Sequence, residues 1–337
     1  MIIQDEGNIK SIQKFLEKNW KKKHILAINS KIFNWFHYNP SEKKYNFLIF
    51  KKKSNILGFL GILKNSKFSN GLIFFDTIWL TTWVAKKAEL GVGIALLMHS
   101  IKCYKYSTIG TIGCNKKART IYKKMGFRVG NMKHYFSINS KIKSFKIIME
   151  SKKISKTHNK YPSNKRIEHL KGDLKLKIFG NDVDELVKKY GKDETYFKNR
   201  YINHPYYKYK IYLIYDLKIV VGFFVTRICI YKKRKALRIV DFFGQEKALI
   251  DINPALQKLI VQIKAEYVDF YEQGIKNSIM LKSGLTKNRF NSKIIIPNYF
   301  EPFLKRNINL GWAIKTNNTK VSPMFKGDCD QDRPSSL

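Results

Sequence analysis

Hydrophobic and polar positions in the first 150 residues alternate between strand-like runs and helix-like spacings. Short apolar runs bounded by polar residues indicate strands, and apolar residues at i, i+3, i+4 and i+7 indicate one face of a helix. The pattern predicts, in order, a helix, a hairpin, a long strand, a helix and a further strand: 1–20, 45–50 with 55–63, 71–80, 94–101 and 107–114.

The stretch NKKARTIYKKMGF, residues 115–127, carries the clearest helix signals in the chain. Asn115 is a suitable N-cap, because its side-chain oxygen can accept a free backbone N–H of the first turn. Gly126 suits the left-handed residue that ends a helix, and Phe127 can fold apolar surface back onto it. A closing strand is predicted at 133–139.

The second half repeats this order of elements after a polar, charged stretch at 151–170, which we interpret as a linker between domains. Both halves follow the order β-β-β-α-β, so the sequence predicts two domains, 1–150 and 171–337. The expected elements of the second half are a helix, a hairpin, a strand, a helix and a strand: 182–191, the residues around 216–218, 236–244, a helix capped at Asn253 with Pro254 in its first turn, and 267–273.

The turn AELGVG, residues 88–93, separates the predicted strand 71–80 from the predicted helix 94–101. Free backbone N–H groups and the helix dipole at such a helix start suit an anionic pyrophosphate, and glycine lets the ligand approach the backbone closely. A Rossmann dinucleotide site needs a third glycine where Leu96 stands, and no P-loop motif is present. Both of these nucleotide sites are therefore disfavoured.

The net charge of +40, from 65 Lys and Arg against 25 Asp and Glu, changes the picture of the partner. It indicates an anionic partner, such as a nucleotide-bearing small molecule, a nucleic acid or an anionic lipid surface. The abundance of Lys, Asn and Ile together leaves a purely compositional origin open. The lysines are scattered and no nucleic-acid-binding motif accompanies them, so we do not expect specific nucleic-acid binding.

The remaining composition excludes several classes of protein. No apolar run approaches 18 residues, so no transmembrane segment is predicted, although peripheral membrane association stays open. The start of the chain shows no signal-peptide pattern, and we expect a cytoplasmic protein. The four cysteines, Cys103, Cys114, Cys229 and Cys329, lie far apart, so we expect free thiols and no metal site.

The turn at 88–93 and the segment 115–127 together resemble the GCN5-related N-acetyltransferase (GNAT) family. In that family a Q/R-x-x-G-x-G/A turn precedes an N-x-x-A-x-x-x-Y-x-x-x-G-F segment by one helix and one strand. The second motif matches at every position, whereas Ala88 replaces the Gln or Arg that opens the first. The resemblance implies an α/β (α+β) fold with two GNAT-like domains, each a mixed, mostly antiparallel sheet flanked by helices.

The resemblance also implies roles for particular residues, with acetyl-CoA or another acyl-CoA as co-substrate. Asn115 would contact the pantetheine arm or act only as a cap, and Tyr122 would protonate the departing CoA thiolate or act only as core. Asp76 is a candidate general base, with a water relay as the alternative. The backbone amides expected to bind the pyrophosphate are those of Leu90, Gly91, Val92, Gly93 and Ile94.

The second half has no G-x-G turn, so we interpret it as a degenerate GNAT-like domain that binds the acceptor rather than CoA. Three features of this half could bind a substrate: polar residues within apolar strands, the tyrosine-rich block 196–209, and the segment GDCDQDRPSS. The alternative is that they form internal ion pairs or solvated loops. The candidates are Arg200, Arg227, Asp241, Asp330 and Arg333.

The layout of the whole chain resembles tandem-GNAT proteins of bacterial surface-polysaccharide (O-antigen) gene clusters. This implies N-acyl transfer to a small-molecule acceptor, an amino sugar that is nucleotide-linked. Carboxylates and Arg suit sugar hydroxyls and phosphates, and aromatic faces stack on pyranose rings. Two alternatives remain: a FemABX-like aminoacyl transferase that uses aminoacyl-tRNA, and a non-catalytic module that binds an anionic polymer.

Overall fold

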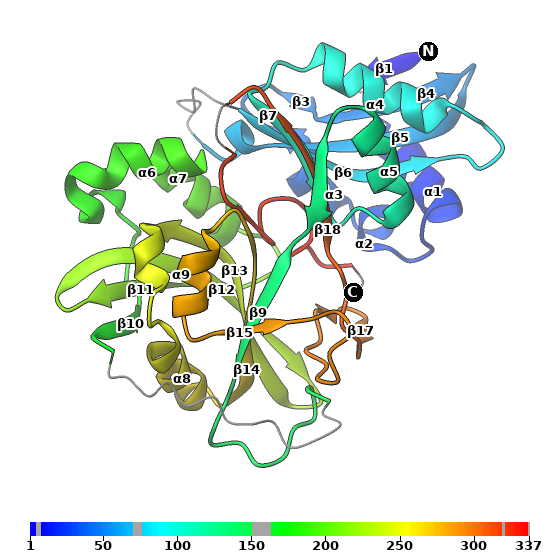
Figure 1. The fold of residues 1–337 in the computed structure, drawn as a ribbon. Coiled ribbons are helices and arrows are strands. Elements are labelled where there is room, and N and C mark those ends of the chain that lie inside the picture. Colours follow the sequence, from blue (N-terminus) through cyan, green and yellow to red (C-terminus); the bar gives the residue numbers. More distant parts are fainter. Residues whose placement is uncertain (5–7, 70–75, 150–162, 319–320, 336–337) are drawn as a thin grey trace.

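The computed structural model describes residues 1–4, 8–69, 76–149, 163–318 and 321–335, and two twisted β-sheets dominate it (Figure 1). The first sheet has the strand order β1-β4-β5-β6-β7-β18-β8. Its strands are β1 Ile2–Gln4, β4 Phe47–Lys52, β5 Asn55–Lys64, β6 Thr77–Ala85, β7 Thr108–Ile112, β18 Gly311–Thr316 and β8 Arg128–Asn131.

The second sheet repeats the arrangement with the order β10-β11-β12-β13-β14-β9-β15. Its strands are β10 Lys165–His169, β11 Tyr209–Asp216, β12 Ile219–Tyr231, β13 Arg234–Gly244, β14 Ala265–Gln273, β9 Lys133–Ile138 and β15 Thr286–Asn288, and β19 Met324–Phe325 pairs with the end of β14. Two small hairpins complete the strands, β2 Tyr38–Asn39 with β3 Lys44–Tyr45 and β16 Tyr299–Phe300 with β17 Phe303–Leu304.

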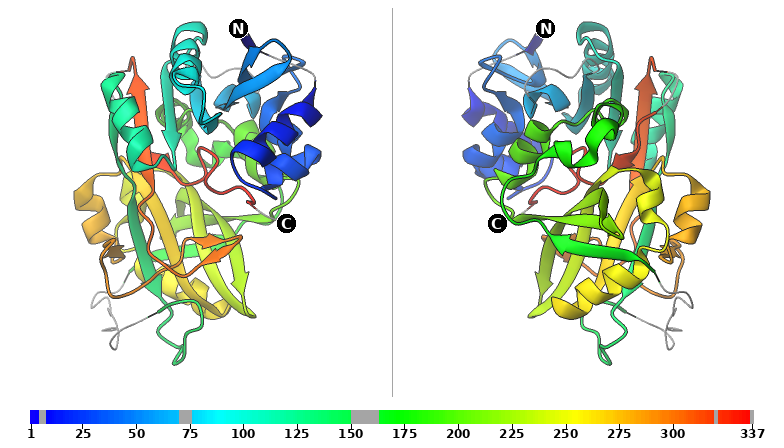
Figure 2. Two further views of the ribbon diagram at one scale, coloured as in Figure 1. Left: turned by 90° about the vertical axis from the view of Figure 1, so that its right-hand side faces the viewer. Right: turned by 90° about the vertical axis from the view of Figure 1, so that its left-hand side faces the viewer.

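Helices cover both faces of the first sheet, and strand alternation explains why. Along β5, Phe59 and Leu63 pack into the core beneath one set of helices, whereas Leu60 and Ile62 pack beneath the other. The first set is α1 Ile9–Asn19, α2 Ile25–Ile28 and α3 Ser30–His37, and the second is α4 Val92–Cys103 and α5 Lys116–Lys124 (Figure 2).

Short helices surround the second sheet in the same way. They are α6 Val183–Tyr190, α7 Glu194–Phe197, α8 Asn253–Gln262 and α9 Asn277–Lys282, with shorter helical segments at η2 Leu176–Asp182, η3 Lys198–Ile202 and η4 Glu246–Leu249. A further turn, η1 Asn65–Lys67, follows β5 of the first sheet. In the part of the chain that the structure describes, no helix is both long and apolar enough to cross a membrane.

The predicted mixed, mostly antiparallel sheets flanked by helices are confirmed, but each sheet contains one strand from the other half of the chain. β18 lies between β7 and β8 of the first sheet, and β9 lies between β14 and β15 of the second. The two halves therefore complete each other, and sheet membership does not follow the predicted division at 150 and 171.

Two details of the predicted elements differ from the structure. The linker predicted at 151–170 contains strand β10, which pairs with β11. The sequence pattern missed this strand because an edge strand of five residues can form its backbone hydrogen bonds without a strong apolar pattern. The strand predicted at 71–80 is observed as β6, Thr77–Ala85, and residues 71–75 lie outside the described part of the chain.

The parallel strands of each sheet separate along their length. β6 and β7 pair at three positions, ending at Trp79 and Gly110, and then diverge. A register shift between Leu60 and Ile62 of β5 accompanies the bend of β6. β13 and β14 pair only as far as Ile239 and Phe270. We call these two openings the first splay and the second splay.

The strand exchange predicts that the first half cannot fold alone. A fragment of residues 1–150 would lack β18 and would expose the unpaired edges of β7 and β8. We expect this fragment to be insoluble or to lack a cooperative thermal transition by circular dichroism, whereas the full chain unfolds in one transition. A stable fragment with a native-like melting curve would show that β18 is dispensable.

Candidate functional site

The turn before α4 has the backbone that an anion site needs. Gly91 is left-handed, with φ of 82°, and no side chain caps the helix. The N–H groups of the first helical turn therefore have no intrahelical acceptor. The Leu90 side chain is 94% exposed, and a Cβ placed on Gly91 would meet no atom within 4 Å. The amides are thus open to a ligand, and they fit the pyrophosphate of a nucleotide cofactor.

Trp83 on β6 connects this turn to the first splay. Its indole N–H donates to the Gly93 carbonyl at 3.1 Å, and a Cβ on Gly93 would lie 3.3 Å from the indole nitrogen. The same indole ring lies 5.6 Å from the ring of Tyr122, centroid to centroid. Trp83 therefore lies between the turn and Tyr122.

Tyr122, on α5, is 2% exposed and packs against Phe127. Burial raises the pKa of its hydroxyl far above the usual range, with the nearby thiols of Cys114 and Cys329 acting in the same direction, while a hydrogen bond with Thr111 opposes them. Tyr122 is therefore a neutral phenol at physiological pH. It can donate its proton only once a strong base develops beside it.

Asn115 acts as the predicted N-cap, since its side-chain oxygen accepts the Ala118 N–H at 2.9 Å. The residue is exposed at the start of α5. Its contact with a pantetheine arm stays a prediction.

The segment 324–335 enters both splays. β19 pairs with Glu272 and Gln273 of β14, and the Gly327 N–H donates to the Val240 carbonyl of β13 at 2.8 Å. The second splay is thus bridged by the chain itself, and the described part of this half contains no glycine cradle like that at Gly91.

The first splay receives the next residues of the same segment. The Cys329 thiol donates to the Leu80 carbonyl of β6 at 3.7 Å and also contacts the backbone of Ile112 on β7. The Arg333 guanidinium donates to the Thr82 hydroxyl at 3.3 Å. The segment lies on the face of α1, α2 and α3, whereas Tyr122 and α4 lie on the other face.

A pocket of about 280 Å³ opens beside this segment. Its walls come from four parts of the chain: the loop between α1 and α2, the residue after β7, the β16–β17 hairpin, and the segment 324–335. Residues that line it include Trp20, His24, Gly113, Glu301, Asp330 and Arg333. Asp330 forms an ion pair with Arg333 and accepts the Gln331 amide at 2.8 Å.

His24 lines the pocket but cannot serve as a base. Burial, with help from Arg333 and Lys21, lowers its pKa to about 2, and its Nδ1 accepts the Leu26 N–H at 3.1 Å. A neutral imidazole that uses one nitrogen as acceptor carries its proton on the other. His24 therefore offers a hydrogen-bond donor.

The structure divides the five predicted substrate-binding residues into two groups. Asp330 and Arg333 line the pocket, as described. Arg200 donates to the carbonyls of Gly327 and Cys329 at 2.9 and 2.7 Å, and Arg227 holds Asp332 through both carboxylate oxygens at 3.1 and 2.9 Å. Both arginines anchor the segment 324–335: Arg227 forms an internal ion pair, and Arg200 binds backbone carbonyls.

Asp241 anchors the same segment through a residue that the sequence analysis missed. Lys192, 1% exposed, lies between Asp241, at 2.7 Å, and Asp328, at 2.5 Å. Tyr201 also donates to Asp241 at 2.7 Å. Nothing local distinguishes Lys192 from the many other lysines of this chain. Its role follows only from the tertiary contact with Asp328.

Asp76 does not join Tyr122. It lies just before β6, where it accepts Ser66 N–H and hydroxyl at 3.2 and 2.8 Å, and burial raises its pKa. Trp83 is seven positions further along the chain, which at a rise of 3.3 Å per residue is about 23 Å. Asp76 thus lies at the paired end of β6, whereas the strands open at the other end, and its role as general base stays a prediction.

Lys326 is a buried cation in the same segment. Its Nζ donates to the Asn298 carbonyl at 3.2 Å and to the Asn298 side-chain oxygen. Burial and the neighbouring Arg238 lower its pKa to about 7, while Asp332 and Asp269 oppose the shift.

Among the described residues, no group of three or more His, Cys, Asp or Glu is placed to hold a metal ion.

Comparison with solved structures identifies the fold. A GCN5-related N-acetyltransferase from Anabaena variabilis superposes over 94% of this chain and 73% of its own, with a TM-score of 0.54 and 13% identity. A conserved protein of unknown function from Enterococcus faecalis V583 superposes over 94% and 72%, with a TM-score of 0.52 and 9% identity. No family model and no curated protein sequence matches the chain. The chain thus has the GNAT fold.

The lowered pKa of Lys326 predicts that the free energy of unfolding increases as pH rises above 7. Below pH 7 the lysine is protonated in both states, so the folded protein bears the full cost of a buried charge. Between pH 7 and about 10.5 the folded state releases the proton that the unfolded chain still holds, so stability increases. We expect the melting temperature of the wild type to gain more between pH 7.0 and 9.5 than that of Lys326→Met. Parallel curves for the two proteins would show that Lys326 is not titrating there.

Proposed function

We propose that this protein is an acyl-CoA-dependent N-acyltransferase that transfers an acetyl or other acyl group to a nucleotide-linked amino sugar in the cytoplasm, for surface-polysaccharide synthesis. The observation that carries the proposal is the indole of Trp83, which contacts the open amide turn on one side and Tyr122 on the other. The GNAT fold and the name of the Anabaena protein support the same chemistry.

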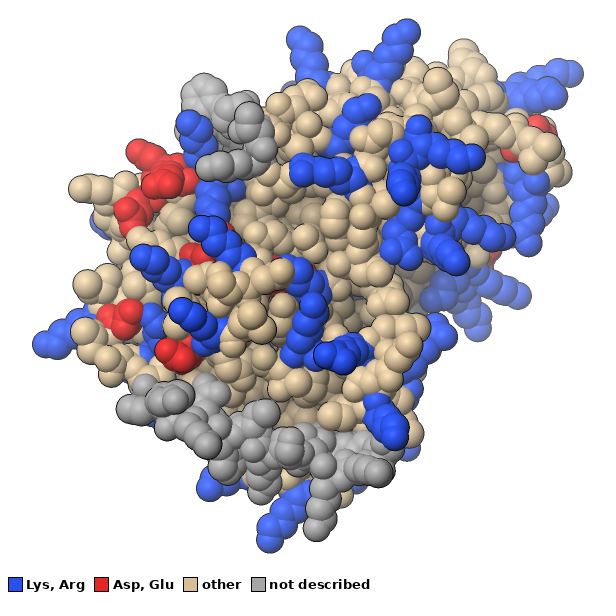
Figure 3. Space-filling model, in the orientation of Figure 1, with Lys and Arg blue, Asp and Glu red and all other residues tan. Residues whose placement is uncertain are grey.

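In this proposal the first module binds the donor. The amides of the turn from Leu90 to Ile94 would hold the pyrophosphate, and the side of the first splay that faces α4 and α5 would take the pantetheine arm. Glu89 is the single acidic residue between 77 and 149, where Lys and Arg are frequent, so this side of the protein attracts an anionic ligand. Figure 3 shows basic side chains spread over the visible face, with few acidic ones.

The acceptor would approach from the opposite face, through the pocket beside Asp330. The exposed Trp20 ring offers a surface for a pyranose, and Asp330, Glu301 and Arg333 offer groups that bind hydroxyls. A volume of about 280 Å³ suits one sugar ring, with the nucleotide left outside.

The reaction then needs one proton donor and one proton acceptor. The donor supplies an acyl thioester, and the amine of the acceptor attacks its carbonyl carbon, so that a C–N bond forms and the C–S bond breaks. Tyr122 gives its phenolic proton to the departing sulfur, since burial keeps the phenol protonated until that charge develops, and the phenolate then regains a proton from water. The amine loses its proton to water in the pocket. His24 cannot take this proton, because one ring nitrogen is already protonated and the other accepts the Leu26 N–H. The Asp330 carboxylate is already paired with Arg333.

Gly91→Val should abolish donor binding without unfolding the protein. Valine disfavours positive φ and blocks the approach to the amides, so we expect the dissociation constant of acetyl-CoA to rise at least 10-fold in calorimetric titration. Gly172→Val is a matched control, because Gly172 has φ of 83° and also has open space around it. If acetyl-CoA fails to bind the wild type, or tRNA stabilises it instead, the proposal is wrong and the aminoacyl-transferase alternative gains.

Tyr122→Phe should separate chemistry from binding. We expect turnover of acetyl-CoA with a panel of nucleotide-linked amino sugars to fall about 100-fold, while acetyl-CoA affinity changes less than 2-fold. Tyr196→Phe controls for the loss of a buried hydroxyl, since the Tyr196 hydroxyl has no hydrogen-bond partner among the described residues. Unchanged turnover in Tyr122→Phe would remove Tyr122 from the mechanism.

A further inference from the structure

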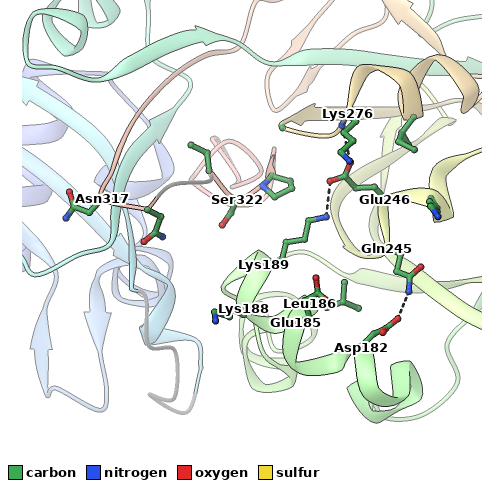
Figure 4. Close-up of a pocket in the computed structure, with 16 residues that line it drawn as sticks. Asp182, Glu185, Leu186, Lys188, Lys189, Gln245, Glu246, Lys276, Asn317 and Ser322 are labelled. Atoms are coloured by element: carbon green, nitrogen blue, oxygen red, sulfur yellow. Dashed lines mark hydrogen bonds and ion pairs between the residues drawn. The ribbon is translucent and has the colours of Figure 1, made fainter.

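The equal strand orders of the two sheets place a second groove where the first module has its donor site. β13 and β14 correspond to β6 and β7, so the residues after β13 and β14 correspond to the turn before α4 and the start of α5. At this position lies a groove of about 1200 Å³. Its walls are α6, residues 245–247, residues 274–279 and residues 317–318 and 321–323 (Figure 4).

The groove differs from the first site in depth. β19 and Gly327 occupy the second splay, so no extended arm can pass between β13 and β14. Pro254 lies in the first turn of α8 and removes one backbone donor there. A ligand in this groove must therefore be short and must be held by side chains.

The charges that line the groove favour an anion. Two carboxylates are already engaged: Asp182 accepts the Gln245 amide, and Glu246 accepts Lys189 at 2.9 Å and the Lys276 N–H at 3.1 Å. Lys188, Lys247 and the Lys276 side chain form no ion pair with any described residue, and the groove also contains Glu185. Three unpaired ammonium groups against two carboxylates without an ion pair, those of Asp182 and Glu185, leave a positive surface.

Both modules contribute to this surface. Asn317 and Asn318 follow β18 of the first sheet, whereas the lysines come from α6, η4 and the start of α9 (Figure 4). Lys189 extends towards Glu246 across the groove, and Asn317 lies on the other side (Figure 4). Clefts between modules are common places for small-molecule sites, and the amides supply donors and acceptors for hydroxyls or a base.

We propose that this groove binds a diphosphate-bearing small molecule that lacks a thioester arm. Lys188, Lys247 and Lys276 hold the phosphates as point charges, and no covalent step takes place there. The diphosphate belongs either to a nucleoside diphosphate or to free pyrophosphate. This site is independent of acyl transfer, since none of its residues lies in the first splay.

Titration of the full-length protein with UDP and with inorganic pyrophosphate, each with CoA at saturation, tests this site. We expect both probes to bind the wild type, and the variant Lys188→Gln/Lys247→Gln/Lys276→Gln to raise both dissociation constants at least 10-fold. UDP binding more tightly than pyrophosphate identifies a nucleotide as the ligand, and equal affinities identify the free anion.

Lys10→Gln/Lys14→Gln/Lys18→Gln is the matched control, because it removes the same charge from the exposed face of α1. We expect this control to change either affinity less than 2-fold. No binding of either probe, unchanged binding in the groove variant, or equal losses in both variants overturns the proposal. If CoA itself does not bind, the acyl-transfer proposal is wrong. The groove proposal can then still be tested, by titrating the wild type and the groove variant with UDP and pyrophosphate in the absence of CoA.

Discussion

The buried ion pairs that hold the segment 324–335 are the constraint on which the rest of the structure depends. Lys192 lies between Asp241 and Asp328, and Arg227 holds Asp332, all with almost no exposure. A buried charge that loses its partner costs about 3–5 kcal/mol, so each of these pairs strongly favours the observed position of the segment. With the segment in place, the second splay is filled and the acceptor side of the first splay gains a wall.

The strand exchange extends the effect of these ion pairs to both sheets. β18 completes the first sheet and β9 completes the second, so neither half presents a finished core on its own. The proposed site is composite for the same reason: the donor turn and Tyr122 come from the first half, whereas Glu301 and Asp330 come from the second. Under the proposed function, the first splay would serve the chemistry and the second would support the fold.

The sequence predicted the local features well and the long-range ones poorly. Apolar periodicity located most helices and strands, and the glycine turn and Asn115 cap have the predicted backbone roles, because each depends on neighbours within a few residues. The exchange of β9 and β18, the role of Lys192 and the distance of Asp76 from Tyr122 depend on contacts between residues far apart in sequence. Arg200 and Arg227 look alike in sequence whether they bind a substrate or hold the chain's own segment.

Hydrogen–deuterium exchange of the full-length protein with and without acetyl-CoA tests the central claim, that the first splay alone receives the donor. We predict slower exchange at the amides from Leu90 to Ala95, which the pyrophosphate would cover, and no change at Gln245–Leu249 in the second module. Protection at 245–249, or no protection at 90–95, would contradict the account.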